Sequence, residues 1–128
     1  MICKNYKDID PLEVGEGITV RWLTHKDLGG DEYLHNHALR MFTIAPQSEV
    51  EIHNHKFTQI VYIMSGKLLF TVLSQDGIRE DREVGPGDFV YTYSFENHGI
   101  RNMSETEPVI LLCCIDCVDG KENCMPTI

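Results

Sequence analysis

Short runs in which hydrophobic and polar residues alternate recur along the chain, and no stretch keeps the 3.6-residue period of an amphipathic helix. The runs are rich in Val, Ile, Thr, Tyr and Phe, the residues that favour strands. The pattern predicts strands at Ile18–Leu23, Leu39–Ala45, Val50–His55, Gln59–Met64, Lys67–Leu73, Ile78–Val84, Phe89–Tyr93, Gly99–Met103 and Val109–Ile115. Strands this short and this closely spaced predict an all-β sandwich or barrel.

The segments between the predicted strands suit tight turns. Ser65-Gly66-Lys67 and Gln75-Asp76-Gly77 each place a residue that tolerates a positive φ between two β-rich runs. Residues 28–34 lack strand character and are expected to form a loop or a short helical turn. The 128 residues contain no internal repeat, so we expect one domain over residues 1–128 with a tail at 116–128.

Charge and hydropathy exclude several classes of function. The chain has 11 Lys and Arg against 20 Asp and Glu, a net charge of −9, which argues against nucleic acid and anionic lipid as partners. Its longest apolar run, Val109–Ile115, is far shorter than the roughly 20 residues of a membrane-spanning helix. The first residues lack the apolar stretch of a secretory signal, so we expect a cytoplasmic protein whose five cysteines are mostly thiols.

Four polar side chains are candidates for a metal site. His53 and His55 are two residues apart, and such residues share one face of a strand. Gln59 has the parity of Val61, which directs its amide into the interior of the barrel. His98 lies in a stretch whose alternation turns it inward if Arg101 faces solvent.

Three neutral imidazoles and an amide oxygen are costly to bury unpaired, but together they suit a divalent first-row metal. The alternative is that His53 and His55 are solvent-exposed beside a turn and that His98 is a loop histidine with hydrogen-bond partners of its own. Spacing alone leaves both interpretations open.

From Gln47 to Asn102 the sequence resembles the two-motif signature of the cupin superfamily. In the first motif, two histidines separated by one residue are followed by a Glu and then by a Gly. Here His53, His55 and Gly66 are in register, and Gln59 takes the Glu position.

The second motif contains Gly, Pro, Gly, His and Asn, of which Gly87, His98 and Asn102 match. The strands around Trp22 and Phe42 also look like those of small stand-alone bacterial and archaeal cupins. The resemblance implies a cupin-type double-stranded β-helix (jelly-roll) barrel, with a core at about residues 47–102. It also implies one divalent metal ion, Fe, Mn, Ni, Zn or Cu, held by His53, His55, Gln59 and His98.

Several positions depart from the family pattern. Gln47 stands where the first motif begins with Gly, and Tyr93 and Phe95 replace the Pro and the second Gly of the second motif. These positions shape the backbone, so the loop before His98 is expected to differ. Gln59 is a weaker donor than a carboxylate and leaves the site one unit more positive, which favours anionic ligands.

Other side chains are candidates for substrate binding. Arg40 has the parity of Phe42 and is either an inward guanidinium beside the metal or an ordinary surface arginine. Tyr62 and Tyr91 are candidates to supply a hydroxyl, and their alternative role is packing. His37 belongs to a second His-x-His and is a candidate for the barrel mouth.

Four cysteines lie near the C-terminus. Cys113 and Cys114 fall in the last predicted strand and are expected to alternate between the core and the opposite face. Cys117 and Cys124 follow in the tail. The pair Cys114 and Cys117 has the spacing of zinc sites, but no second such pair completes a four-thiolate cage. Packing, a tail metal or disulfide, and a redox role all stay open.

The leading hypothesis is a small metal-dependent enzyme that acts on a small oxygenated or acidic substrate, of dioxygenase or of isomerase or tautomerase type. The alternative is a non-catalytic module that binds a small molecule or a metal. Because an incompletely closed barrel leaves strand edges, the resemblance also implies a homodimer.

Overall fold

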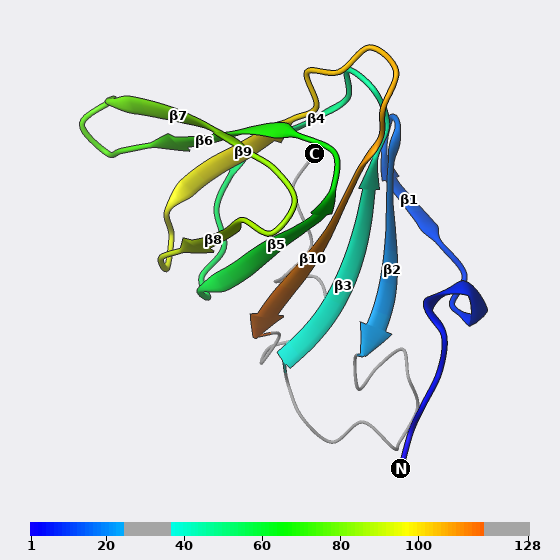
Figure 1. Cartoon of the computed structure of the whole chain (residues 1–128). Coiled ribbons are helices and arrows are strands. Elements are labelled where there is room, and N and C mark those ends of the chain that lie inside the picture. Colours follow the sequence, from blue (N-terminus) through cyan, green and yellow to red (C-terminus); the bar gives the residue numbers. More distant parts are fainter. Residues whose placement is uncertain (25–36, 117–128) are drawn as a thin grey trace.

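The computed structural model describes residues 1–24 and 37–116, and within these ranges the chain is built almost entirely of strands (Figure 1). A short 3-10 helix, η1, spans Tyr6–Asp8. The strands are β1 (Leu12–Gly15), β2 (Ile18–Thr24), β3 (His37–Ile44), β4 (Glu49–His53), β5 (Gln59–Ser65), β6 (Leu68–Leu73), β7 (Arg79–Val84), β8 (Phe89–Thr92), β9 (Asn97–Arg101) and β10 (Val109–Asp116). The described part contains no helix long and apolar enough to cross a membrane.

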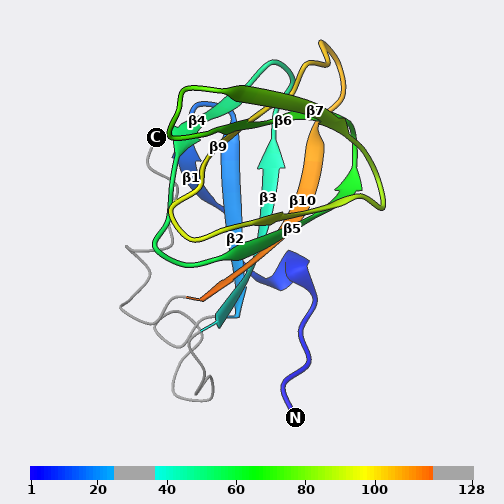
Figure 2. The ribbon, with the colours of Figure 1, turned by 90° about the vertical axis from the view of Figure 1, so that its left-hand side faces the viewer.

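The strands form two antiparallel sheets that face one another across a common interior (Figures 1 and 2). The larger sheet has the order β1-β2-β3-β10-β5-β8 and the smaller one the order β4-β9-β6-β7. In the larger sheet β10 lies between β3 and β5. In the smaller sheet β9 lies between β4 and β6. The all-β prediction is confirmed.

Each strand predicted from the alternation is present, with ends that differ by at most two residues. The prediction missed β1, which pairs with β2 at the edge of the larger sheet and has no buried residue. A short strand without an inward apolar face leaves no alternation to detect. The predictions for residues 28–34 and for the tail beyond Asp116 lie outside the described residues.

Alternate residues of the facing strands fill the interior. In β2, Ile18, Val20 and Trp22 point inward, and in β10 Val109, Leu111, Cys113 and Ile115 do the same. Burying one large aliphatic or aromatic side chain contributes about 1.5–3 kcal/mol. The apolar core therefore provides the rigid walls of any site built between the sheets.

Asn102, the last match to the second cupin motif, is a structural residue. Its side chain is fully buried, and Nδ2 donates to the carbonyls of Ile44 (3.1 Å), Ala45 (3.3 Å) and Glu107 (2.8 Å). Its Oδ1 accepts from the amide of Ser104 at 3.1 Å. Asn102 thus joins the end of β3 to the loop between β9 and β10, since buried carbonyls need such partners.

The turn between β3 and β4 contains a strained residue. Ser48 N–H donates to the carbonyl of Ala45 at 3.1 Å, and Gln47 has a φ of 62°. With Pro46 before it, this is a type II turn, whose third position favours glycine. Gln47 therefore adopts the left-handed region, which is sterically unfavourable for a residue with a Cβ, at the position where the family pattern has Gly.

We expect Gln47→Gly to raise the free energy of unfolding by about 0.5–1 kcal/mol, because relief of the left-handed strain exceeds the added freedom of the unfolded chain. Gln47→Ala is the matched control and should change little, since alanine meets the same strain. Urea unfolding of the metal-free proteins measures both. A glycine variant no more stable than the alanine variant would contradict the strain.

Candidate metal centre

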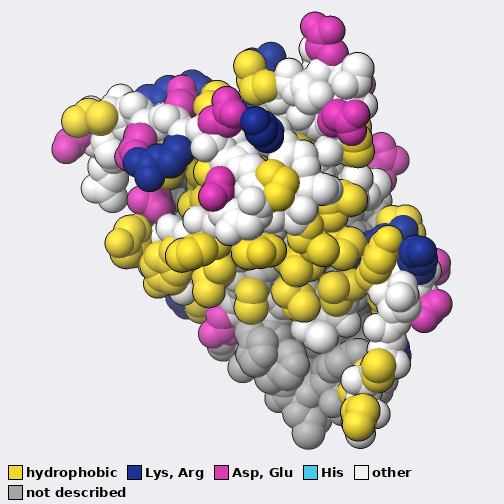
Figure 3. All heavy atoms as spheres, in the orientation of Figure 1, with side chains coloured by type: hydrophobic (Ala, Val, Ile, Leu, Met, Phe, Trp, Pro, Cys, Tyr) yellow, Lys and Arg dark blue, Asp and Glu magenta, His cyan; other side chains and the backbone are white. Residues whose placement is uncertain are grey.

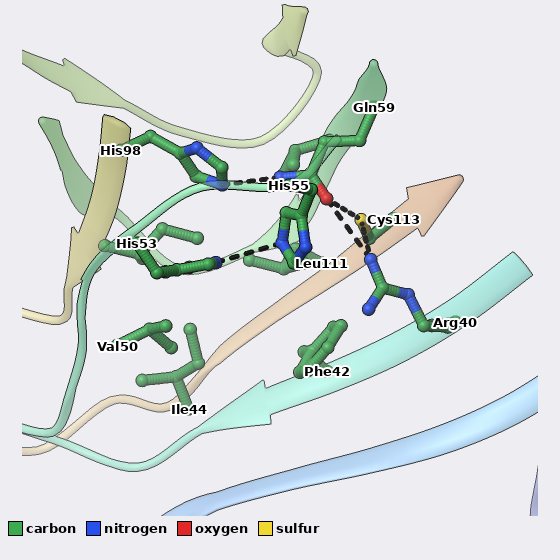
Figure 4. A pocket seen from close by; sticks show the side chains of 12 residues that line it. Arg40, Phe42, Ile44, Val50, His53, His55, Gln59, His98, Leu111 and Cys113 are labelled. Atoms are coloured by element: carbon green, nitrogen blue, oxygen red, sulfur yellow. Dashed lines mark hydrogen bonds between the residues drawn. The ribbon is translucent and has the colours of Figure 1, made fainter. Parts of the chain in front are cut away.

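A small pocket lies between the two sheets (Figure 4). It encloses about 30 Å³, room for an ion and a few ligand atoms. Half of the side chains around it are apolar, and the nitrogen, oxygen and sulfur atoms of the others cluster at one end (Figure 4). The residues that line it are Arg40, Phe42, Ile44, Val50, His53, His55, Gln59, Val61, His98, Ile100, Leu111 and Cys113.

Strand pairing brings His53 and His98 together. His53 at the end of β4 lies directly opposite His98 on β9, and their ring centroids are 4.5 Å apart. The pairing contains a β-bulge between Val50 and His53, so that both side chains line the pocket despite their odd spacing. Gly99 makes room for the bulge, because a Cβ there would lie 3.1 Å from the carbonyl oxygen of Val50.

His55 reaches the same pocket by another route. It lies beyond the end of β4, so the prediction that His53 and His55 share one face of a strand was wrong about the backbone, although both rings line the pocket. The carbonyl of His55 accepts from Phe95 N–H at 2.7 Å, which ties this loop to the loop before His98. Phe95 has a φ of 60°, the conformation that favours glycine.

Backbone carbonyls orient two of the imidazoles. Nδ1 of His53 is 2.7 Å from the carbonyl oxygen of Glu51, and Nδ1 of His98 is 2.8 Å from that of Glu96. Because a carbonyl only accepts, both Nδ1 atoms carry the proton, and each Nε2 is left unprotonated, with a lone pair that can accept a hydrogen bond or bind a metal. This arrangement is typical of metal-binding histidines.

The three rings lie near enough to converge on one ion, with the His98 nitrogen moving closer to the other two when an ion binds. One ring nitrogen from each of His53, His55 and His98 lies within 4.8 Å of the other two. With metal–nitrogen bonds of about 2.1 Å, two nitrogens on one tetrahedral or octahedral ion lie about 3.0–3.4 Å apart. Nε2 of His53 and Nε2 of His55 are 3.1 Å apart. The residues present therefore fit a divalent transition metal.

The site favours neutral imidazoles. The pKa of His98 is lowered to about 4, chiefly by burial and also by the nearby His53 and Arg40, despite the hydrogen bond to Glu96 that raises it. Burial also lowers the pKa of His53, with a smaller contribution from Arg40 in the same direction. Neutral imidazole is the form that binds metal, so little proton release is needed near neutral pH.

Arg40 is buried beside the histidines. Its side chain is 1% exposed, as its parity with Phe42 predicted for the inward alternative. The guanidinium carbon lies 5.0 Å from the ring centroid of Phe42 and 5.5 Å from that of Trp22. Cation–π contacts of this kind help to hold a cation inside an apolar core.

A hydrogen-bonded chain links Arg40 to the histidines through Gln59 (Figure 4). Nη2 of Arg40 donates to Oε1 of Gln59 at 3.2 Å and to Sγ of Cys113 at 2.7 Å. Nε2 of Gln59 is 2.8 Å from Nε2 of His98. Cys113 was not predicted at the site, although its parity with Leu111 and Ile115 places it inward.

Other predicted site residues lie elsewhere. Tyr62 and Tyr91 are 46% and 47% exposed on the outer face of the larger sheet, so their predicted role in the pocket was wrong. Tyr62 has the opposite parity to Gln59 in β5, and Tyr91 pairs with the outward Ile60. His37 begins β3, but its side chain lies outside the described part.

The two described cysteines of β10 alternate as predicted, with Cys113 buried and Cys114 half-buried. Together with Cys3 they are free thiols. Cys117 and Cys124, the candidates for a tail site, lie outside the described residues.

Comparison with known families and structures places this geometry in context. The family model for the cupin domain matches residues 40–115. No curated protein matches the sequence of the chain.

Several solved structures share the fold. A variant of oxalate decarboxylase from Bacillus subtilis is 24% identical with a TM-score of 0.74, over 92% of this chain but 30% of that one. An RmlC-like cupin from Shewanella frigidimarina is 16% identical with a TM-score of 0.73, over 93% of each chain. The polyketide cyclase RemF from Streptomyces resistomycificus is 24% identical with a TM-score of 0.73, over 91% of this chain and 80% of that one. These likenesses confirm the predicted jelly-roll fold.

The low pKa of His98 makes the stability of the metal-free protein depend on pH. Histidine in the unfolded chain titrates near pH 6.5, and folded His98 near 4, so between these values the unfolded state binds more protons. We therefore expect the free energy of unfolding to fall as the pH is lowered through this window, by up to roughly 1.4 kcal/mol per pH unit for one proton.

Urea unfolding of chelator-treated protein between about pH 7 and about pH 4.5 measures this slope. His98→Gln keeps a polar side chain that does not titrate, and it should show a shallower slope. Parallel slopes for the wild type and the variant would rule out His98 as the cause.

Proposed function

The chain belongs to the cupin family, and we propose that it is a metal-dependent enzyme whose His53, His55 and His98 hold one divalent transition metal ion beside a small acidic substrate. The convergence of the three rings carries this proposal. Two of the imidazoles present an unprotonated Nε2 to the pocket because their Nδ1 atoms donate to carbonyls. Gln59, predicted as a fourth ligand, lies beside them.

The charge of the pocket supports an anionic substrate. Among the described residues that line it there is no Asp or Glu, and Arg40 contributes a buried positive charge. Neutral histidines leave the charge of a bound metal uncompensated. A small carboxylate or enolate would offset part of this positive charge, and a guanidinium binds carboxylates well.

Two reaction classes suit such a centre. A bound Fe, Mn, Ni or Cu ion would supply dioxygen chemistry, and any Lewis-acidic ion, Zn included, would polarise a carbonyl for isomerisation or tautomerisation. The protein would hold the substrate's acid group near Arg40 and keep the reacting atoms in an apolar pocket. Bacillus subtilis oxalate decarboxylase, whose fold is similar, has Mn(II) centres.

Elemental analysis of protein purified without chelator under nitrogen tests the metal. We expect close to one equivalent of a divalent transition metal, lost in His53→Ala and in His98→Ala because each removes one of three ligands. Gln75→Ala, in the exposed turn between β6 and β7, is the control and should retain the metal.

Failure to bind metal even after reconstitution would refute the proposed function. Oxygen uptake and isomerisation assays with small hydroxy and keto acids then separate the two reaction classes. A protein that binds metal and ligand without turning over any of them would instead be the non-catalytic module.

We also propose that a second copy of this chain covers the outer face of the larger sheet. Figure 3 shows hydrophobic side chains gathered in a band across the molecule, over β8, β5 and β10. Outward side chains on β5 and β8 are roughly half-exposed or more, namely Ile60, Tyr62, Met64, Phe89 and Tyr91. A patch of this kind is unusual on a monomer.

The charge of the protein favours this face for self-association. Each copy carries a net charge of −9, so two copies repel one another unless they meet where acidic groups are few. The outward residues of β5 and β8 include no Asp or Glu. The contact would thus lie on a sheet face, whereas the sequence suggested strand edges.

Light scattering after size-exclusion chromatography tests the dimer. We expect a dimer at micromolar concentration and a monomer for Tyr62→Asp, which places a charge in the contact. Ile78→Asp alters an equally apolar, 68% exposed residue next to β7 and should leave the dimer intact. A monomeric wild type would exclude the proposal.

A further inference from the structure

The side-chain amide of Gln59 lies between the histidines and the Arg40 guanidinium, and its two ends meet different partners (Figure 4). Oε1 accepts hydrogen bonds from Arg40 Nη2 at 3.2 Å and from Cys113 Sγ at 3.0 Å. Nε2 lies 2.8 Å from Nε2 of His98. The amide nitrogen, and not the oxygen, therefore faces the candidate metal centre.

The chemistry of the neighbours determines this orientation. A guanidinium has N–H donors and no acceptor, so turning the amide over would set its NH₂ group against Arg40. Burial raises the pKa of Cys113, which keeps the thiol proton available as a second donor to Oε1. Nδ1 of His98 donates to Glu96, so its Nε2 accepts from the amide.

The two residues that orient the amide are themselves held in place. Arg40 and Cys113 are directly opposite one another on β3 and β10, and both are buried. The guanidinium also contacts the rings of Trp22 and Phe42. Gln59 is 5% exposed and cannot turn its oxygen to the histidines without losing both hydrogen bonds.

We propose that Gln59 serves the centre as a hydrogen-bond donor to a bound anion and not as a fourth metal ligand, positioned by Arg40 and Cys113. This inference rests on the proposed function, because it takes a metal on the three histidines as given. The lone pair on His98 Nε2 serves one partner at a time, so a cation there leaves the amide N–H in need of another acceptor.

That acceptor identifies the class of ligand. A buried N–H without an acceptor costs free energy, and an unprotonated oxygen of a small carboxylate or an enolate provides one. The same anion would offset part of the positive charge of the metal and of Arg40. Gln59 therefore favours a ligand with an anionic oxygen next to the histidines. A Glu in place of Gln59 would repel such an anion and reverse this preference.

The test separates metal binding from anion binding. Free Mn(II), followed by its electron paramagnetic resonance signal, gives the metal affinity of the wild type, Gln59→Leu and His98→Ala. Calorimetric titration of the Mn(II)-loaded proteins with glycolate then gives the anion affinity. Gln75→Leu, in the exposed turn between β6 and β7, is the matched control.

We expect Gln59→Leu to bind Mn(II) within about threefold of the wild type and to bind glycolate about tenfold more weakly, the effect of one hydrogen bond to a charged group. A loss of Mn(II) affinity in Gln59→Leu as large as that in His98→Ala would show that Gln59 is a ligand and overturn the inference. Unchanged glycolate affinity would overturn it as well. A wild type that binds no Mn(II), Zn(II) or other divalent metal would refute the proposed function itself, a result distinct from both.

Discussion

The register of β4 against β9 is the constraint on which the candidate centre depends. It sets His53 opposite His98, and the bulge in β4 turns both Val50 and His53 toward the interior. Gly99 suits the bulge, because a Cβ there would lie only 3.1 Å from the carbonyl oxygen of Val50 and would force the backbone to shift. The pair of imidazoles is thus a property of the backbone, and His55 joins it from a loop that Phe95 ties down.

Burying a cluster this polar costs free energy, and hydrogen bonds within the fold offset that cost. The carbonyls of Glu51 and Glu96 take the Nδ1 protons, and the Gln59 amide joins His98 to Arg40. The buried guanidinium contacts aromatic rings and the Gln59 amide. Its positive charge lowers the pKa of His98 in the same direction as burial does, and both effects keep the imidazole neutral. The neutral imidazole costs less free energy to bury than the charged form, and it is also the form that binds a metal. The same protonation state therefore favours both the stability of the fold and metal binding.

Alternation along the chain was enough to predict the principal strands, because one buried face imposes a period of two. It gave the inward direction of His98 once Arg101 was taken to face solvent, and it left Arg40 open between the interior and the surface, where the structure selects the interior. It could not predict the bulge in β4, since an inserted residue changes parity without leaving a mark in the hydrophobic pattern. The same rule, applied to β5, would have placed Tyr62 outside once Gln59 was placed inside. Cys113 was missed because an inward cysteine resembles an apolar residue until Arg40 is found opposite to it.

Within residues 1–24 and 37–116, the two non-glycine residues with a positive φ show that departures from the family pattern at turns differ from the departure at the site. Gln47 and Phe95 occupy glycine positions of the pattern and still adopt left-handed φ angles, so the chain keeps the turn geometry at an energetic cost. Gln59 also departs from the pattern, but no backbone conformation depends on it. A change at a turn position is tolerated because the surrounding structure imposes the conformation. A change at Gln59 alters the charge and the donor that face the pocket, so the preference for ligands follows from that one side chain and its two neighbours.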